Sequence, residues 1–381
     1  NGLGLIHVQQ ERFDEAIELF GQAQTIDPER GDFTENLIKA FEQSAKTMAH
    51  AARFPAAIKT LERALVMRPG DVSLTCRMSF VLSLAGRHGE AFAAADRALS
   101  KNSQSAEAHD VRGLALLGLG QIDHAIKSFR TALDCDIHYP PAYSNLGMAY
   151  RAQGEHRDAV SCFDEAIRLD DGNTQAYNNL GISLLDMNDL VQAEAALRNA
   201  LAIEPDYAEA HFNLSRVLLM DEDFEDGWKQ NEWRWLCNDF PSTWREFPQA
   251  MWQGEDLADK TILVWSEQGV GDEIMFANTL PELVQNAEKV IIECNDRLVP
   301  VFERSFDSVT AVARQEPPDS KIENAAADFQ IPIGSICKFY RKSVEEFPSD
   351  RAGYLTADSD LTAEIKARYA ALGDGVKVGI S

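Results

Sequence analysis

A short loop at residues 265–273, WSEQGVGDE, holds the densest group of side chains that could do chemistry. Besides Glu273 at its end, it carries two carboxylates, one amide and two glycines: Glu267, Asp272, Gln268, Gly269 and Gly271. The loop directly follows a strand-like run at 261–264, and an apolar-periodic stretch comes after it. Ligands of parallel sheets bind at the carboxyl ends of strands, which is where this loop falls. The loop is therefore a candidate for a phosphate cradle, a catalytic carboxylate or a helix cap.

The two glycines form part of a dinucleotide fingerprint, G-x-G-x-x-G, but the third small residue is absent. Ile274 stands where that residue is needed, although Glu293 mimics the acid that binds a ribose hydroxyl. A P-loop is excluded more firmly, because no Gly-Lys-Ser/Thr follows the glycines. The sequence therefore disfavours a nicotinamide or flavin site, and no cofactor is expected.

A purely structural interpretation of the loop is also open. The glycines would make a tight turn, and Asp272 would cap a helix that begins at Glu273, because Asp is among the best N-cap residues. This interpretation leaves unexplained why three polar side chains crowd one strand–helix turn.

Strand-like and helical segments alternate after residue 260, and these elements must position the loop. Strands are expected at 261–265, 289–294, 308–313 and 328–333, and helices at 273–285, 298–306 and 361–372. Because helices separate the strands, the sheet is predicted to be parallel, which gives a Rossmann-like α/β domain over residues 261–375. A further strand is expected to begin in residues 376–381.

The first two-thirds of the chain repeats every 34 residues. Small residues recur at fixed places: Gly113, Gly147 and Gly181; Ala125, Ala159 and Ala193; Ala132, Ala166 and Ala200. Large residues lie between the two alanine columns and are expected to fill the gap between neighbouring repeats: Phe129, Phe163 and Leu197. The period predicts an α-solenoid of helix pairs with about seven units, the first incomplete, in a domain placed at residues 1–223.

An asparagine column is the most specific feature of the repeats. Asn145, Asn179 and Asn213 recur at the same spacing, and Val111 takes this place in the preceding repeat. Asparagine is a poor helix former, so three in register need an explanation. Either they hydrogen-bond within or between repeats, or they grip the backbone of an extended polypeptide, because a side-chain amide both donates and accepts.

The repeats resemble the tetratricopeptide repeat (TPR). The asparagine column resembles the ladder in the repeat superhelix of protein O-linked N-acetylglucosamine transferases. This resemblance implies a protein or peptide partner on the hollow inner face of the repeats. It stops there, because no histidine follows His211 and the histidine-containing motifs of those enzymes' catalytic domain are absent.

The pattern W-x-G-x-x-L-x-x-K-T-I-L-V-W-x-E-Q-G-x-G-D-x-I-M-F-A at 252–277 is similar to TPR proteins that carry a heptosyltransferase-like glycosyltransferase domain. The resemblance implies a GT-B fold, of which 376–381 would open a truncated second half. It also implies that Asp272 is the general base that deprotonates an acceptor hydroxyl. The neighbouring positions would form the acceptor loop: Glu267, Gln268, Gly269 and Gly271. A nucleotide-sugar would be the donor and a glycan a candidate acceptor, and the segment shown is expected to be inactive because the donor-binding half is missing.

A tryptophan-rich junction at residues 224–260 separates the two regions. All six tryptophans lie between Trp228 and Trp265. The junction is predicted to be a cap whose aromatic residues seal the last repeat and dock the α/β domain. A nucleic-acid stacking surface is disfavoured because the segment is acidic.

Composition limits the partners. Lys and Arg number 36 against 61 Asp and Glu, and the net charge of −25 repels phosphate backbones, so no nucleic acid is expected. No apolar run reaches the ~20 residues of a membrane span. The six cysteines lie far apart, which argues for reduced thiols in a cytoplasmic protein without a structural zinc site. Two function classes follow: a glycosyltransferase whose repeats recruit the acceptor, or a non-enzymatic scaffold for protein–protein interaction.

Overall fold

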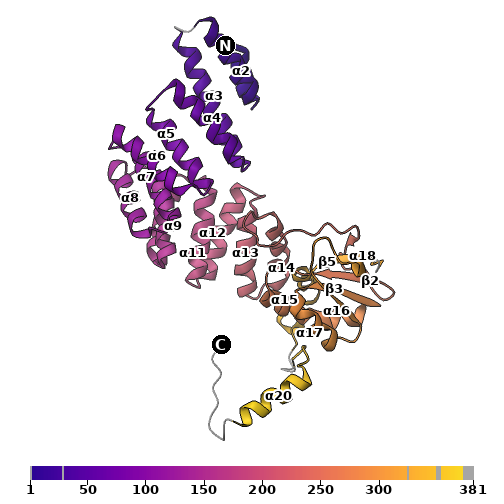
Figure 1. The fold of residues 1–381 in the computed structure, drawn as a ribbon. Coiled ribbons are helices and arrows are strands. Elements are labelled where there is room, and N and C mark those ends of the chain that lie inside the picture. Colours follow the sequence, from indigo (N-terminus) through magenta and orange to yellow (C-terminus); the bar gives the residue numbers. More distant parts are fainter. Residues whose placement is uncertain (1, 28–29, 324–325, 349–352, 372–381) are drawn as a thin grey trace. The chain divides into compact units, whose positions relative to one another are not determined.

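The computed structural model describes residues 2–27, 30–323, 326–348 and 353–371. The chain forms two compact units, residues 1–205 and residues 206–381. Figure 1 shows the first as a stack of helices and the second as helices around a small sheet. The strand expected in residues 376–381 lies outside the described residues.

The first unit consists of six consecutive helix pairs, which confirms the predicted solenoid. The pairs are α1 (Gly2–Gln9) with α2 (Phe13–Ile26), α3 (Gly31–His50) with α4 (Phe54–Met67), α5 (Val72–Leu84) with α6 (His88–Lys101), α7 (Ala106–Gly118) with α8 (Ile122–Cys135), α9 (Pro140–Gln153) with α10 (His156–Leu169), and α11 (Thr174–Asp186) with α12 (Leu190–Ile203). Each pair packs against the next along the chain.

The glycine column explains how the two helices of a pair approach so closely. A Cβ atom added to Gly147 would lie 2.7 Å from the ring of Phe163, and one added to Gly181 would lie 2.6 Å from Leu197. Phe163 and Leu197 are themselves fully buried. The large residue therefore covers the glycine of its own repeat, whereas the sequence had led us to expect it between neighbouring repeats.

A seventh helix pair, α13 (Ala208–Met220) with α14 (Phe224–Asn231), belongs to the second compact unit. A 3-10 turn, η1 (Glu232–Leu236), continues α14. Two tryptophans connect this pair, one within it and one to Arg341. The indole of Trp233 stacks on His211 with ring centroids 3.9 Å apart, and the indole N–H of Trp228 donates to the Arg341 carbonyl at 2.7 Å.

The second unit contains a five-stranded parallel sheet with the order β1-β5-β2-β3-β4. The strands are β1 (Ala250–Met251), β2 (Thr261–Trp265), β3 (Lys289–Cys294), β4 (Val309–Ala313) and β5 (Phe329–Pro332). From β2 the chain moves outward to β3 and β4, and then returns to the other side of β2 to form β5. The expected parallel sheet is confirmed; the two-residue β1 was not expected.

Both faces of the sheet are buried because successive side chains of a strand point to opposite sides. Ile262 and Val264 of β2 pack into one apolar cluster, and Leu263 packs into the other. The surrounding helices and turns are α15 (Val270–Phe276), η2 (Ala277–Thr279), α16 (Leu280–Asn286), η3 (Asp296–Leu298), α17 (Val299–Ser305), α18 (Ser320–Glu323), η4 (Ile333–Ser335), α19 (Cys337–Tyr340), η5 (Val344–Glu346) and α20 (Ser359–Ala370).

The helix after β2 differs from the expected one at 273–285. It begins three residues earlier, at Val270, and a 3-10 turn divides it before Pro281. Proline lacks a backbone N–H and belongs in the first turn of a helix, so the chain restarts there as α16. None of the described helices is long and apolar enough to cross a membrane.

Candidate functional site

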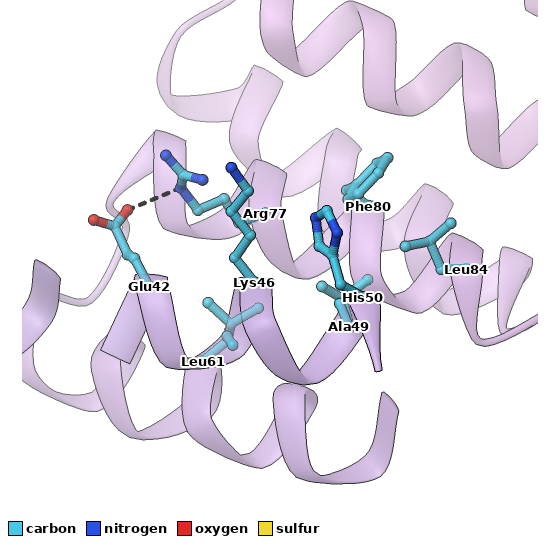
Figure 2. Close-up of a pocket in the computed structure, with 10 residues that line it drawn as sticks. Glu42, Lys46, Ala49, His50, Leu61, Arg77, Phe80 and Leu84 are labelled. Atoms are coloured by element: carbon cyan, nitrogen blue, oxygen red, sulfur yellow. Dashed lines mark ion pairs between the residues drawn. The ribbon is translucent and has the colours of Figure 1, made fainter. Parts of the chain in front are cut away.

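The first helices of successive pairs form one continuous face of the repeat unit, because α3, α5, α7, α9 and α11 contact one another in turn. A pocket of about 440 Å³ lies between α3 and α5 (Figure 2). Its apolar lining is Ala45, Ala49, Leu61, Phe80, Val81 and Leu84. Phe80 and Leu84 are 43% and 47% exposed, which is unusual for side chains of this size.

A second pocket of about 350 Å³ adjoins the first and shares Arg77 and Phe80 with it. Its polar lining includes Arg77 from α5, Glu107 and Asp110 from α7, Tyr139, Ser144 and Asn145 at the start of α9, and Asn173 and Gln175 at the start of α11. We call the two pockets together the repeat groove.

Burial dominates the electrostatics of the second pocket. Asp110 is only 3% exposed, and burial raises the pKa of its carboxyl to about 7, although a hydrogen bond from Asn145 works in the other direction. Burial likewise raises the pKa of the Glu107 carboxyl, against the nearby Arg77 guanidinium. Two carboxyl groups thus lie where water solvates their charged form poorly, and a cation placed beside them would stabilise that form.

The structure places the three asparagines of the ladder in different surroundings. The Asn145 side-chain amide donates to the Asp110 carboxylate at 2.9 Å, which is a hydrogen bond between neighbouring repeats. Asn179 is 8% exposed, and within the described residues its Nδ2 atom has no hydrogen-bond partner. Asn213 is also buried, in the second unit. Asn145 therefore makes the hydrogen bond between repeats that was one of the two interpretations of the column. That the three asparagines bind the backbone of a polypeptide stays a prediction.

The groove residues were missed by the sequence analysis, although the 34-residue period contained a signal. Arg77 precedes Val111 by one period and so belongs to the same column as Asn145. Cys76, Asp110 and Ser144 form the adjacent column. A search for polar residues at repeat positions, and not for asparagine alone, would have found them.

In the second unit, Glu267 follows β2 but is not available to a ligand. It is fully buried, as is its partner Arg234 of η1. Arg234 donates to both carboxylate oxygens of Glu267 at 2.7 and 2.9 Å, and the Gly334 N–H donates to one of them at 2.7 Å. Glu267 therefore joins the end of β2 to η1 and to the turn after β5.

This ion pair occupies the position between β2 and β5 where the strand order reverses. Open parallel sheets commonly bind ligands in the crevice at such a reversal. Here Arg234 also donates to the Ser335 hydroxyl at 2.9 Å, and a Cβ added to Gly334 would overlap the Glu267 carboxylate. The contacts of Arg234 and Glu267 thus lie at the carboxyl ends of β2 and β5.

The other loop residues have backbone roles. Gln268 adopts a left-handed conformation with φ of 60°, and its N–H donates to the Ser242 hydroxyl. Gly269 is the N-cap of α15, and Gly271 lies within the first turn of that helix. The Asp272 carboxylate accepts from the Gly269 N–H at 3.0 Å. Asp272 thus caps α15 from its third position, and the expectation that it precedes a helix beginning at 273 was wrong.

A polar pocket of about 450 Å³ lies at the carboxyl ends of β2, β3 and β4. Residues that follow these strands line it: Ser266, Gln268, Glu273, Asn295, Asp296 and Arg314. Burial raises the pKa of Glu273, whose carboxylate accepts from the Asn295 N–H at 2.9 Å. The Ser266 hydroxyl is buried without a partner among the described residues.

Glu293, the mimic of a ribose-binding acid, is likewise committed to the protein. It is 1% exposed and forms an ion pair with Arg245, which comes from the tryptophan-rich junction. Arg245 also reaches Glu316, beyond the end of β4. The junction therefore supplies the cations, Arg234 and Arg245, that neutralise the buried Glu267 and Glu293.

Comparison with known proteins gives the same assignment for the repeats. Family models described as "tetratricopeptide repeat" match residues 1–72, 82–140, 140–173 and 184–227. Protein FlbA of Caulobacter vibrioides is 32% identical over 180 residues, which cover 44% of this chain and 30% of that protein. Tetratricopeptide repeat protein 33 of Mus musculus is 40% identical over 86 residues, covering 23% of this chain and 33% of that protein. The chain thus spans about a third of the length of these relatives.

Solved structures of other repeat proteins are also similar. A thermophilic TPR protein of Thermus thermophilus matches with a TM-score of 0.45 and 20% identity, covering 48% of this chain and 99% of that chain. The first TPR of Spaghetti, bound to an HSP90 peptide, matches with a TM-score of 0.30 and 25% identity, covering 31% of this chain and 94% of that chain. With helix pairs in the described part of residues 1–231 and family models matching across 1–227, the chain belongs to the tetratricopeptide repeat family through this region.

Proposed function

We propose that the repeats bind an extended segment of a partner protein along the repeat groove. The observation that carries the proposal is the continuity of the groove: two pockets on the face of the first helices share Arg77 and Phe80. Pocket volumes of about 350 and 440 Å³ lie in the range of concave binding sites and are large enough to receive side chains of a bound segment. TPR proteins typically bind peptides or proteins, and the Spaghetti structure holds an HSP90 peptide.

A selection experiment tests this proposal. Random dodecapeptides displayed on phage are selected on the immobilised 381-residue chain, and enriched peptides are measured by fluorescence anisotropy. Phe80→Asp places a charge in the apolar pocket and should weaken binding about tenfold or more. Val66→Asp is the matched control, because Val66 is 79% exposed on the second helix α4, outside the groove. Equal binding to both variants, or no enriched peptide, would contradict the proposal.

A second candidate function concerns the α/β unit, which we propose supplies the acceptor side of a sugar-transferring enzyme with a Rossmann-like half of a GT-B fold. The polar pocket favours it, because hydroxyl, amide and carboxylate groups are the partners that polyhydroxylated ligands need. Glu273 is the buried carboxylate that lines this pocket, whereas the general-base role of Asp272 stays a prediction. The alternative is a scaffold in which this unit has no ligand.

Ligand-observed NMR separates the two alternatives. Saturation transfer from the protein to methyl glycosides of glucose, mannose and N-acetylglucosamine is measured for the wild-type chain and for Ser266→Val. The transferase candidate predicts transfer to at least one glycoside and a loss of it in the variant, since Ser266 presents a hydroxyl without a partner among the described residues. No transfer, or equal transfer in both proteins, would favour the scaffold.

A further inference from the structure

The charges of the repeat groove are arranged unevenly, and an ion pair separates them. The Arg77 guanidinium and the Glu42 carboxylate are 2.9 Å apart and neutralise each other (Figure 2). On the side of α3, Lys46 lines the first pocket and adds a positive charge to it. On the side of α7, Glu107 and Asp110 line the second pocket, and neither forms an ion pair with any described residue.

The second pocket has a further group suited to a cation. The Ser144 hydroxyl oxygen is shielded from solvent and has no hydrogen-bond partner among the described residues. A hydroxyl oxygen offers lone pairs to an ammonium or guanidinium group. Asp110 is more than nine-tenths buried and accepts one hydrogen bond, from Asn145. A buried carboxylate is costly unless a charge of opposite sign compensates it.

The first pocket has the opposite preference. Phe80 and Leu84 offer exposed apolar surface beside the pocket floor, so burial of an apolar side chain there removes two such surfaces from water. The amine of Lys46 lies on the same side of the helices as Phe80 (Figure 2). This ammonium group repels a basic side chain of the partner from the first pocket. The charges therefore determine which side chain of a bound segment enters which pocket.

We infer that the repeat groove selects a partner segment that carries a bulky apolar side chain, which occupies the pocket of Phe80 and Leu84, and a lysine or arginine, which occupies the pocket of Glu107 and Asp110. This inference rests on the proposed function and specifies the chemistry of the partner. The recognition element for the cation is the pair of carboxylates with the Ser144 hydroxyl. The Glu42–Arg77 ion pair marks the boundary between the two pockets.

The test uses the enriched dodecapeptides, synthesised with acetylated N-termini so that their only cations are side chains. The expected peptides carry an apolar residue and a basic residue at a constant separation. Glu107→Lys should weaken their binding about tenfold or more, because a charge-assisted contact becomes a like-charge contact. Glu62→Lys is the matched control, since Glu62 is exposed on the second helix α4 and the change in net charge is the same. Circular dichroism checks that both variants fold.

A charge exchange completes the test. Replacing the basic residue of a peptide by glutamate should weaken its binding to the wild-type chain and restore part of its binding to Glu107→Lys. Peptides that need Phe80 but bind equally without a basic residue would overturn the inference and leave the proposed function standing. Peptides that are insensitive to Phe80→Asp would overturn both.

Discussion

Replacing Glu267 by alanine should destabilise the second unit strongly, because its partner Arg234 would remain buried. Glu267 accepts two charge-assisted hydrogen bonds from Arg234 and one hydrogen bond from the Gly334 N–H. Hydrogen bonds to charged groups contribute about 1.5–3 kcal/mol each, and removing one partner of a buried pair costs about 3–5 kcal/mol. Arg234 keeps a contact with Glu232 at 2.8 Å, so we expect the lower end, about 3 kcal/mol.

Tryptophan fluorescence during urea unfolding measures this cost selectively. All six tryptophans lie between Trp228 and Trp265, within the second unit, so the signal does not report on the repeats of residues 1–205. Glu288→Ala is the control, because Glu288 is exposed and its substitution should change the unfolding free energy by no more than about 0.5 kcal/mol.

A double variant separates charge from packing. Arg234→Met with Glu267→Leu removes both charges, so no uncompensated ion stays inside the protein. The loss of unfolding free energy in the double variant should be smaller than the sum of the losses in Arg234→Met and Glu267→Leu by about 1 kcal/mol or more. A cost below about 1 kcal/mol for Glu267→Ala, or strict additivity in the double variant, would refute the reasoning.

Three further predictions follow from single contacts. Gly147→Ala should destabilise the repeats by about 1–3 kcal/mol in unfolding followed by circular dichroism, because the new methyl group meets the Phe163 ring. The control is Gly89→Ala in α6, where the methyl group enters open space and should leave stability unchanged or raise it. Asp272→Ala should cost about 0.5–2 kcal/mol by tryptophan-monitored unfolding and Asp272→Asn much less, because an amide oxygen can still accept from the Gly269 N–H; equal costs for the two variants would contradict the cap. The pKa of Asp110 is raised to about 7, so the folded state binds this proton more tightly than the unfolded state does. The unfolding free energy of the wild-type chain should therefore fall between about pH 4 and pH 7, by at most about 4 kcal/mol. Asp110→Asn should lack this fall in a pH series of unfolding curves, and the same profile in both proteins would contradict the prediction.

The repeats could be predicted from the sequence because their decisive contacts are local and recur. Gly147 and Phe163 are 16 residues apart, and the same spacing relates Gly181 to Leu197. A period in the sequence therefore encodes the contact directly. The strands of the sheet were predictable for a similar reason, since runs such as Val290–Ile292 are buried on both faces and read as continuous apolar segments.

The role of the loop after β2 could not be read in the same way. Glu267 is bound by Arg234, 33 residues earlier, and Glu293 by Arg245, 48 residues earlier. Neither separation repeats, so no pattern in the sequence connects these residues. The polar residues of this one turn thus have different roles. Glu273 lines the polar pocket because of its place in the helix, and no sequence motif marks it.

Arg234 and Arg245 also determine where the chain can be divided. A fragment that starts at Ala250, where the sheet begins, would contain all the strands that the structure describes but neither Arg234 nor Arg245. Glu267 and Glu293 would then have to be buried without their cations, and the fragment would resist folding on its own. A fragment from residue 206 onward retains both arginines together with α13 and α14. The last helix pair of the repeats thus belongs to the same folding unit as the sheet. Recombination of the two parts of the chain would have to keep α13 and α14 on the same fragment as the sheet.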